Sequence, residues 1–353
     1  MRLFAVMLLS IASACCAAQP PGDTSHGVIL QYHHVSDTMP AITSISPKRF
    51  TEQLDWLAAH HFEVWPLAKL VDYVKQGKPT PQRVVAITFD DAYESIYTTA
   101  FPILKKRGWP FTIFVATKFV DSRREFYLSW EQLKEMQASG ATIGNHTYNH
   151  AHLIRRLDGE STDAWQRRVT DDIEHAARMI HDHLGVTTRL FAYPYGEYDG
   201  AVIAIVDKLG YIGFGQQSGA IGPNSLFAVL PRFPMGGQYS EMNSFKTKVE
   251  TLPLPIETVT TEPLVGDQLR PTLTLHFTRS GLRLNQLVCY GPDGITALTK
   301  ISDNTFEARS KDPVPVGRSR YNCTMPVEHS TRFYWFSQMW IRKEPDGSWY
   351  PEP

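Results

Sequence analysis

The chain has 353 residues, of which 42% are hydrophobic, so it can bury one large core or two moderate ones, and its length favours two domains. Charged residues make up 20% and the formal net charge is -1, which excludes a basic nucleic-acid surface and a polybasic membrane patch. Aromatic residues make up 12%, and the chain contains no low-complexity run or solenoid repeat, so the composition argues against disorder.

The first 18 residues have the features of an export signal. Arg2 provides a positive charge, residues 3–11 form an apolar stretch, and Ala17 and Ala18 form a small-residue cleavage site. The apolar stretch is too short to span a bilayer comfortably, so we expect no integral membrane segment after cleavage. Cys15 follows small residues as in a lipoprotein, but no Leu stands at the usual position before it. We therefore expect an exported protein, periplasmic or secreted, with lipoprotein anchoring as the weaker alternative.

Residues 28–215 alternate short apolar runs with segments of helical periodicity. Runs with strand character occur at residues 28–32, 84–89, 111–116, 142–144, 190–193 and 211–214. Ser46 and Pro47 predict the cap and first residue of one helix, and the apolar spacing over 165–180 predicts a second helix that ends before Gly185. Repeated strand–helix units predict a parallel sheet, either open or closed into a barrel.

The pattern changes after residue 250. Residues 251–256 carry two prolines and predict a linker, because proline ends helices and central strands. Short runs rich in Thr, Val and aromatic residues follow at 272–277, 286–290, 321–325 and 332–341. They predict a small all-β sandwich of about 100 residues. We therefore expect a signal peptide at 1–18, an α/β domain at 19–250 and a β-sandwich domain at 257–353.

Signal cleavage leaves two cysteines, Cys289 and Cys323, and both lie in the strand-like runs of the β region. An even pair of cysteines in an exported chain indicates one disulfide. Two buried free thiols are the alternative.

Four short polar motifs follow four of the predicted strands, and the carboxyl ends of parallel strands share one rim where active sites are built. The first motif, Thr-Phe-Asp-Asp at residues 88–91, places Asp90 and Asp91 directly after a buried run. A helix cap would explain one of these acids but not both. A metal-binding carboxylate beside a catalytic base explains the pair.

The second motif covers residues 145–150 and contains His146 and His150. Four residues apart, the two imidazoles would lie on one face of a helical turn and could bind one cation, although this spacing is common by chance. Together with an Asp from an earlier strand they give two His and one carboxylate, which leaves coordination positions open for water and substrate. This ligand set suits Zn²⁺ first, with Co²⁺, Ni²⁺ or Fe²⁺ as alternatives.

The third and fourth motifs supply candidate substrate and acid groups. Tyr193, Pro194 and Tyr195 would form a rigid aromatic wall with a backbone N–H near a developing oxyanion, or only a strand-to-helix turn. His33 or His34, at the end of the first strand, could protonate a leaving amine. Elsewhere, Trp130 could line a sugar groove, and core packing is an equal alternative.

The sequences TFDD, HTYNH and FAYPYG resemble the motifs of the NodB-type polysaccharide deacetylases, carbohydrate esterase family four, over roughly residues 28–250. The resemblance implies a distorted (β/α) barrel with fewer than eight complete units. It also implies Asp90 as the general base, with Asp91, His146 and His150 as metal ligands. The implied reaction is metal-dependent removal of N-acetyl groups from a polysaccharide that contains N-acetylglucosamine.

Two positions depart from the family pattern. The family's arginine two residues before Pro-Tyr-Gly is Ala192 here, and Arg232 is a candidate to steer the catalytic carboxylate in its place. The late Leu-x-x-His that supplies the family's general acid is missing from the end of this domain. The segment 28–33 resembles instead the circularly permuted subgroup that deacetylates poly-N-acetylglucosamine, which implies His33 as the acid, with His34 as its rival.

In the expected mechanism, Asp90 takes a proton from the attacking water, and the metal and the N–H of Tyr195 stabilise the oxyanion. His33 then protonates the amine as acetate departs. Peptidoglycan and chitin oligosaccharides are alternative substrates, and a glycan-binding protein that has lost activity is a further alternative. A glycosidase would need two carboxylates that flank a glycosidic bond, for which Glu94 and Glu197 are weak candidates.

Overall fold

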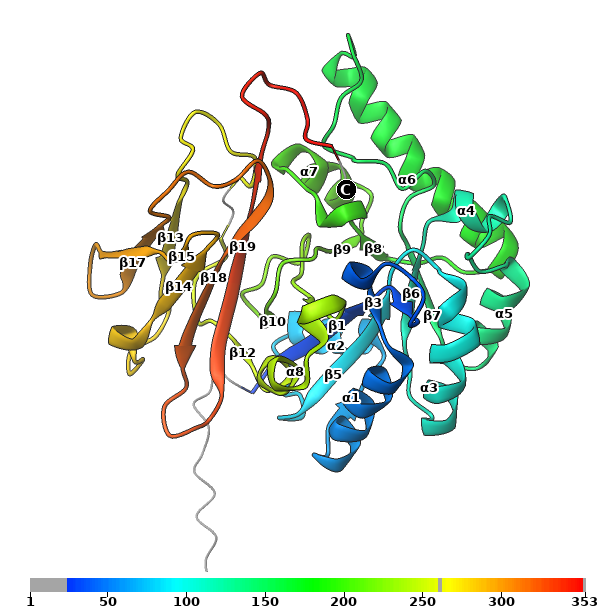
Figure 1. Cartoon of the computed structure of the whole chain (residues 1–353), viewed down its shortest axis with the longest axis horizontal. Coiled ribbons are helices and arrows are strands. Elements are labelled where there is room, and N and C mark those ends of the chain that lie inside the picture. Colours follow the sequence, from blue (N-terminus) through cyan, green and yellow to red (C-terminus); the bar gives the residue numbers. More distant parts are fainter. Residues whose placement is uncertain (1–23, 260–261, 352–353) are drawn as a thin grey trace, which may run out of the picture.

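The computed structural model describes residues 24–259 and 262–351, in two parts that lie side by side (Figure 1). The α/β part, blue to green in Figure 1, precedes the β-rich part, yellow to red. The signal peptide expected at residues 1–18 lies outside the described residues. None of the helices in the described ranges is long and apolar enough to cross a membrane.

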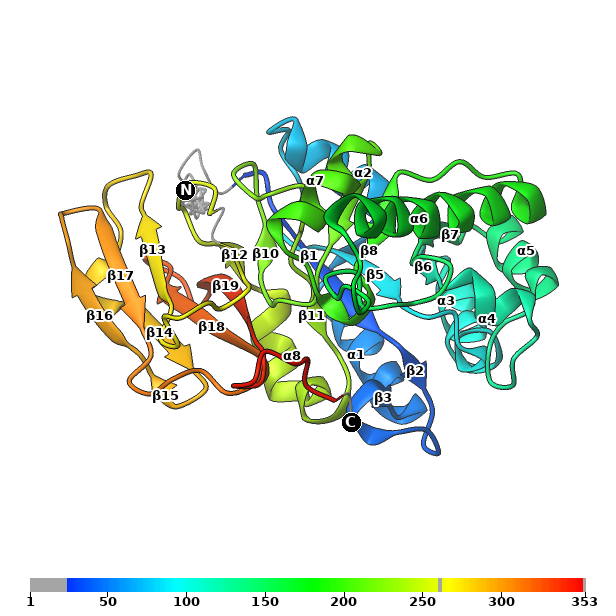
Figure 2. The same ribbon diagram turned by 90° about the horizontal axis from the view of Figure 1, so that it is seen from above.

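The α/β part is built on a nine-stranded sheet that curls into an incomplete barrel (Figure 2). Its main path runs in the order β10-β1-β5-β6-β7-β8-β9, with β4 beside β5 and β11 beside β1. All neighbours are parallel except β1 and β10. The strands are β1 Gly27–Tyr32, β4 Glu63–Val64, β5 Val84–Phe89, β6 Thr112–Val115, β7 Thr142–Asn145, β8 Leu190–Ala192, β9 Ile212–Phe214, β10 Ala220–Ile221 and β11 Phe233–Pro234. The predicted α/β class is confirmed.

Eight α-helices occur within the described ranges, and all belong to the α/β part. They are α1 Pro47–Ala59, α2 Leu67–Lys75, α3 Phe101–Arg107, α4 Thr117–Asp121, α5 Trp130–Ala138, α6 Thr162–Leu184, α7 Gly200–Lys208 and α8 Met242–Val249. The predicted start of α1 is confirmed, because Ser46 Oγ accepts the N–H of Arg49 at 3.1 Å and Pro47 is the first helical residue. The predicted end of α6 is confirmed too, since Gly185 adopts the left-handed conformation there (φ 68°).

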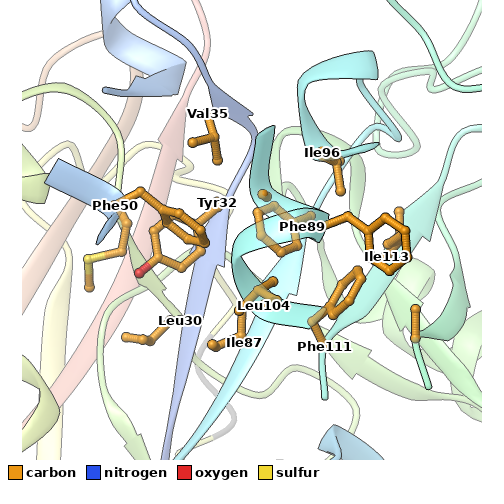
Figure 3. Packing of buried hydrophobic residues seen from close by; sticks show 14 of the residues in the cluster. Leu30, Tyr32, Val35, Phe50, Ile87, Phe89, Ile96, Leu104, Phe111 and Ile113 are labelled. Atoms are coloured by element: carbon orange, nitrogen blue, oxygen red, sulfur yellow. The ribbon is translucent and has the colours of Figure 1, made fainter. Parts of the chain in front are cut away.

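The register between β1 and β5 brings two functional residues together. Tyr32 pairs with Phe89 as the last residue of each strand, so His33 and Asp90 leave the sheet side by side. The rings of Tyr32 and Phe50 lie 5.1 Å apart and those of Tyr32 and Phe89 5.5 Å apart, in the core beneath this edge (Figure 3). The Asp90 N–H also donates to the Tyr32 carbonyl at 2.9 Å. Core packing therefore fixes the backbone from which the site is built.

The β-rich part contains two sheets around an apolar core that includes Leu273 and Trp340. One sheet has the order β12-β19-β18-β14-β15 and the other β13-β17-β16. The strands are β12 Leu252–Pro253, β13 Thr272–His276, β14 Val288–Gly291, β15 Gly294–Ile295, β16 Ala297–Lys300, β17 Thr305–Arg309, β18 Gly317–Pro326 and β19 Phe333–Arg342. A disulfide between Cys289 and Cys323 joins β14 to β18 at directly paired positions, as predicted.

Strand β19 is covered on both faces. Trp340 points into the β-sandwich core, whereas Met339 and Ile341 pack with Val202 of α7. Residues 337–341 are consequently all buried. Figure 2 shows β18 and β19 between the three-stranded sheet and the barrel. The two parts of the molecule thus share this sheet as a common wall.

The linker expected at residues 251–256 is not a free connection. Leu252–Pro253 forms β12, which pairs in parallel with Tyr334 and Trp335 at the edge of β19. An edge strand tolerates proline because one side of its backbone needs no sheet partner. The connection between the two parts is therefore itself part of the β-rich sheet.

The buried lysine of α8 predicts a specific pH dependence of stability. Burial, reinforced by the charge of Arg320, lowers the pKa of Lys248 to about 8, and its Nζ donates to the Tyr239 carbonyl at 2.6 Å. The folded-state pKa lies below that of the unfolded chain, so protonated Lys248 destabilises the fold fully below about pH 8, by about 3 kcal/mol. This penalty disappears as the pH rises from about 8 to about 10.4.

We therefore expect the free energy of unfolding of the wild type to rise relative to that of Lys248→Met between about pH 7.5 and about pH 10. Urea unfolding of both proteins across this range measures the difference. Lys246→Met, at an exposed position of the same helix, is the matched control and should show no such trend. A wild-type-to-Lys248→Met difference that is independent of pH would contradict the prediction.

Candidate active site

The polar motifs after β1, β5, β7 and β8 meet at one edge of the sheet, as predicted from the strand order. His33 Nε2 lies 3.9 Å from Asp90 Oδ2, and His146 Nε2 lies 3.1 Å from Asp91 Oδ1. The Nδ1 of His146 in turn lies 2.7 Å from the carbonyl of Ala192, the last residue of β8. Direct contacts therefore connect all four strand ends.

Asp91, His146 and His150 form the one candidate metal cluster found in residues 24–259 and 262–351. The Nε2 atoms of His146 and His150 lie 3.1 and 3.0 Å from Oδ1 of Asp91, and the ligand atoms all fall within 4.8 Å of one another. Asp91 and His146 are buried and His150 is half-buried. A cation held here would have protein on most sides and one side open.

The hydrogen bonds made by His146 and Asp91 leave atoms that can bind a metal ion. His146 Nδ1 donates to the Ala192 carbonyl, so in the neutral ring Nε2 carries a lone pair that faces Asp91. Asp91 Oδ1 is buried and has no hydrogen-bond donor among the described residues. Atoms with lone pairs that converge in a buried place need a cation between them. The bond from His146 to a backbone carbonyl is also the usual outer contact of a metal-binding imidazole.

The loop that carries the two histidines corrects one expectation. We expected residues 145–150 to form a helical turn, but the loop after β7 is irregular, with Thr147 at φ 64° and His150 at φ 53°. Nine non-glycine residues in the described ranges have positive φ, and Asp91, Ala92 and Tyr195 are also among them. Four of the nine, Asp91, Thr147, His150 and Tyr195, therefore lie in these motifs, and Ala92 directly follows one of them. Such strained backbone is concentrated at functional sites.

Asp90 is fully buried and tightly held. Arg232 donates to both of its oxygens, from Nη1 to Oδ1 at 2.7 Å and from Nη2 to Oδ2 at 2.8 Å, and Gln31 Nε2 donates to Oδ2 at 2.6 Å. Burial alone would raise the pKa of Asp90, but the charge of Arg232, the nearby His146 and the hydrogen bonds outweigh it and hold the pKa below its ordinary value. Asp90 is therefore ionised at neutral pH.

The two candidate acids of the first strand have different surroundings. The side chain of His33 is 17% exposed and lies beside Asp90. His34 is buried, and its ring stacks on Tyr93 with 3.6 Å between centroids. Burial, together with the neighbouring charge of His33, lowers the pKa of His34 to about 4. The structure thus gives His33, and not His34, the contact with the carboxylate.

Comparison with known sequences now places the chain. The profile of the family described as polysaccharide deacetylase matches residues 77–213. The poly-beta-1,6-N-acetyl-D-glucosamine N-deacetylase of Staphylococcus aureus (strain MRSA252) is 31% identical over 194 residues, which cover 54% of this chain and 67% of that protein. The chain belongs to the polysaccharide deacetylase family. The protein of the same name from Escherichia coli (strain K12) is 25% identical over 250 residues, and the chain spans 37% of its length.

Two solved structures resemble this chain in fold and sequence. IcaB from Ammonifex degensii aligns with a TM-score of 0.54 and 29% identity, over 64% of this chain and 96% of that one. The Streptococcus pyogenes deacetylase PplD, solved in complex with acetate, aligns with a TM-score of 0.56 and 25% identity, over 63% of this chain and 98% of that one. Each of these matches leaves more than a third of the present chain without a counterpart.

The aromatic wall expected at residues 193–195 is reduced to one side chain. Tyr193 is fully buried and its hydroxyl donates to the Ala228 carbonyl at 2.7 Å, so its ring cannot face a ligand. Pro194 is also buried. Tyr195 alone is half-exposed, because its left-handed backbone (φ 59°) turns it away from the core.

The structure does not bring Trp130 to the site. Its ring stacks on His183 at 4.3 Å, with an interplanar angle of 3°, and its Nε1 donates weakly to Asp121 at 3.5 Å. None of these partners belongs to the four motifs. Trp130 also packs against the barrel core, which was the alternative considered from the sequence.

Two kinds of contact at this site were not predicted from the sequence. Gln31 is two residues before His33, and its place on a buried strand gave no sign that it binds Asp90. Glu197 and His152 flank the third and second motifs and bind each other, with 2.7 Å between Oε2 and Nδ1. The signal for the second pair was available, since a charged residue directly follows Pro-Tyr-Gly and a histidine lies two residues after the HTYNH motif.

The geometry of this cluster predicts that each chain binds one metal ion. We expect apo-protein titrated with Zn²⁺ in a calorimeter to bind one ion, and Asp91→Asn or His150→Ala to weaken binding by more than about 100-fold, since even outer contacts are worth 10–100-fold. Asp90→Asn is the matched control, because it changes the adjacent carboxylate and keeps all three ligands. Equal weakening by Asp90→Asn and Asp91→Asn would contradict this division of roles.

Proposed function

We propose that this chain catalyses metal-dependent hydrolysis of N-acetyl groups in a polysaccharide that contains N-acetylglucosamine, with release of acetate. The observation that carries the proposal is buried Asp90, held by Arg232, directly beside the cluster of Asp91, His146 and His150. The relatives from Staphylococcus aureus and Escherichia coli that are named poly-beta-1,6-N-acetyl-D-glucosamine N-deacetylases support this substrate class.

A divalent cation held by Asp91, His146 and His150 would polarise the acetamide carbonyl and lower the pKa of a water molecule. Two imidazole nitrogens and one carboxylate oxygen with an open side suit Zn²⁺, and Co²⁺, Ni²⁺ or Fe²⁺ can use the same ligands. The protein contributes the fixed position of these ligands, because the Ala192 carbonyl holds the His146 ring.

Asp90 is the general base in this proposal. A carboxylate has about four lone-pair sites, and Arg232 and Gln31 donate to three of them, two on Oδ2 and one on Oδ1. The remaining lone-pair site on Oδ1 is our candidate acceptor for the proton of the attacking water. Because Arg232 stays charged, it keeps Asp90 ionised before the reaction and fixes its orientation during proton transfer.

His33 is the general acid and Tyr195 the oxyanion donor. His33 lies beside Asp90 and is partly accessible, so it can reach a substrate that Asp90 also reaches. We assign the protonation of the leaving amine to this ring. Tyr195 lies in the turn Pro194–Gly196 next to His150, with 4.7 Å between ring centroids. Its backbone N–H is our candidate to stabilise the developing oxyanion.

Two rival functions lose support from these contacts. A binding protein without activity was suggested by Ala192, but Arg232 supplies the guanidinium that Ala192 lacks. A glycosidase was suggested by Glu94 and Glu197, but Glu197 is fully buried and paired with Arg318 and His152. Buried and already paired, Glu197 cannot flank a glycosidic bond.

Export of the protein is supported by the β-rich part. The disulfide between Cys289 and Cys323 belongs to a protein that folds in an oxidising compartment. Together with the signal sequence proposed for residues 1–18, it supports our proposal that the enzyme acts in the periplasm or outside the cell, where a polymeric glycan is accessible.

The first test is acetate release from oligomers of poly-β-1,6-N-acetylglucosamine. We expect release by the Zn²⁺-loaded protein, loss after chelation, and recovery when Zn²⁺ or Co²⁺ is added back. Asp90→Asn should lower kcat by about 10²–10⁴-fold while it retains metal, because it removes the base but no ligand. Absence of release from these oligomers and from chitin oligomers, with metal bound, would contradict the proposed substrate class and direct the search to peptidoglycan.

The adjacent histidines of the first strand provide a matched pair of variants. We expect His33→Gln to lower kcat by about 10²-fold or more, because it removes the proton donor beside Asp90. His34→Gln should act mainly on the thermal midpoint, because it removes a buried ring that stacks on Tyr93. Initial rates and circular dichroism melts of both variants check this. If His34→Gln loses more kcat than His33→Gln, His34 and not His33 is the general acid.

A further inference from the structure

The loops that carry His150 and Tyr195 also contact the β-rich part, through one buried carboxylate. Glu197 follows the turn of Tyr195 and is 0% exposed. Its Oε2 accepts the N–H of His152 Nδ1 at 2.7 Å, and its Oε1 accepts Nη1 of Arg318, from β18, at 2.9 Å. The hydroxyl of Tyr350, in the C-terminal segment, donates to Oε1 as well.

The C-terminal segment returns to the barrel, as both views show (Figures 1 and 2). There it also contacts the loop that follows the second motif. Arg155 donates to the Tyr350 carbonyl at 3.2 Å, and its guanidinium lies 4.7 Å from the Tyr350 ring and 5.2 Å from the Trp349 ring. Arg155 Nη2 is also 3.7 Å from Glu197 Oε1. The histidine loop, the tyrosine turn and the β-rich part therefore meet at Glu197.

A buried carboxylate is stable only where positive charge and hydrogen bonds replace water. Glu197 draws these partners from two sources, His152 and Arg155 of the histidine loop, and Arg318 and Tyr350 of the β-rich part. If one partner is removed, the buried charge of Glu197 is compensated incompletely, and the residues around it rearrange. The position of Glu197 thus depends on the β-rich part.

From Glu197 a continuous series of contacts reaches the metal cluster. The ring of His152 stacks on Tyr195, with 3.8 Å between centroids and 8° between planes. The Tyr195 ring lies 4.7 Å from the His150 ring, and the guanidinium of Arg318 lies 5.6 Å from the Tyr195 ring. These contacts connect Arg318 and Glu197, through Tyr195, to His150, a candidate metal ligand.

The tryptophans of the β-rich part do not suggest a separate glycan platform. Trp340 is buried in the sandwich core, Trp335 packs edge-on against Phe233 of the barrel at 5.3 Å, and Trp349 packs on Arg155. Each of these rings is used for packing. The contacts of the β-rich part with the barrel are therefore better supported as its role at the site than glycan binding by these tryptophans.

We propose that Glu197 is a positioning residue that holds the Tyr195 turn against the His150 loop, and that Arg318 and Tyr350 of the β-rich part keep it in place. The proposal rests on the function proposed above for this site. In it, the β-rich part is a structural component of the active site, and Glu197 acts through its neighbours without touching the substrate.

The test compares Glu197→Gln, Arg318→Met and Tyr350→Phe with the control Arg342→Met. Arg342 is half-buried in β19 and donates to the Val314 carbonyl at 2.7 Å, so its contact stays within the β-rich part. Each apo-protein is titrated with Co²⁺ while its visible absorption spectrum is recorded. Its thermal midpoint is measured by circular dichroism, and kcat and KM are measured on poly-N-acetylglucosamine oligomers.

We expect the three variants at Glu197 and its partners to bind Co²⁺ about 10-fold more weakly, with a changed absorption spectrum, as outer contacts of metal sites do. Their kcat should fall by about 10-fold or more, with a smaller change in KM, because the oxyanion donor and not the glycan contact is displaced. Arg318→Lys, which keeps the charge, should recover part of both losses. The control should match the wild type in spectrum, affinity and kcat.

If Arg318→Met and Tyr350→Phe match the wild type in Co²⁺ affinity, absorption spectrum and kcat, the inference is overturned. The proposed deacetylase activity would remain intact. A wild-type protein that releases no acetate would overturn the proposed function, while the Co²⁺ spectra would still test the positioning role. If Glu197→Gln does not fold, Tyr350→Phe decides, because it removes one oxygen and keeps the ring.

Discussion

Two adjacent carboxylates are buried at the end of β5, and each needs its own positive partner. Asp90 receives Arg232 in a bidentate pair, whereas Asp91 Oδ1 has only two imidazole nitrogens near it and no donor within the described residues. A buried charge that is compensated incompletely is unfavourable in a low-dielectric site, so the second carboxylate favours a bound cation. The same difference supports the proposed roles, in which the carboxylate paired with a permanent cation acts as the base and the other carboxylate binds the metal.

The positions of these groups follow from the barrel core and from the shared wall. The pairing of Tyr32 with Phe89 sets His33 beside Asp90, and the His146 contact with the Ala192 carbonyl ties the end of β7 to the end of β8. Because β19 is buried on both faces, the β-rich part cannot shift relative to the barrel without exposure of apolar surface on one side. A rigid wall of this kind can hold an active-site loop in place.

Patterns that are local in sequence predicted most of the fold and pointed to the residues of the candidate metal cluster. Strand ends, the start of α1 and the end of α6 depend on neighbouring residues, and so do the motifs around Asp91 and His150. The predicted helical turn of residues 145–150 was wrong because Thr147 and His150 adopt left-handed backbone, which residue spacing cannot reveal. Contacts such as Glu197 with Arg318, 121 residues later, depend on how two domains dock, and a single sequence contains no signal for that.

The family resemblance implies an arginine at position 192, and the guanidinium that binds Asp90 here belongs to Arg232 instead. Ala192 packs in the same apolar cluster as Phe114, and the guanidinium of Arg232 lies 5.2 Å from the Phe114 ring. A second arginine at position 192 would bring another cation to a buried carboxylate that Arg232 and Gln31 already bind. The backbone of Ala192 keeps its own task, since its carbonyl orients His146. Position 192 therefore needs a small apolar residue, and the guanidinium must come from Arg232, next to the short strand β11 that pairs with β1.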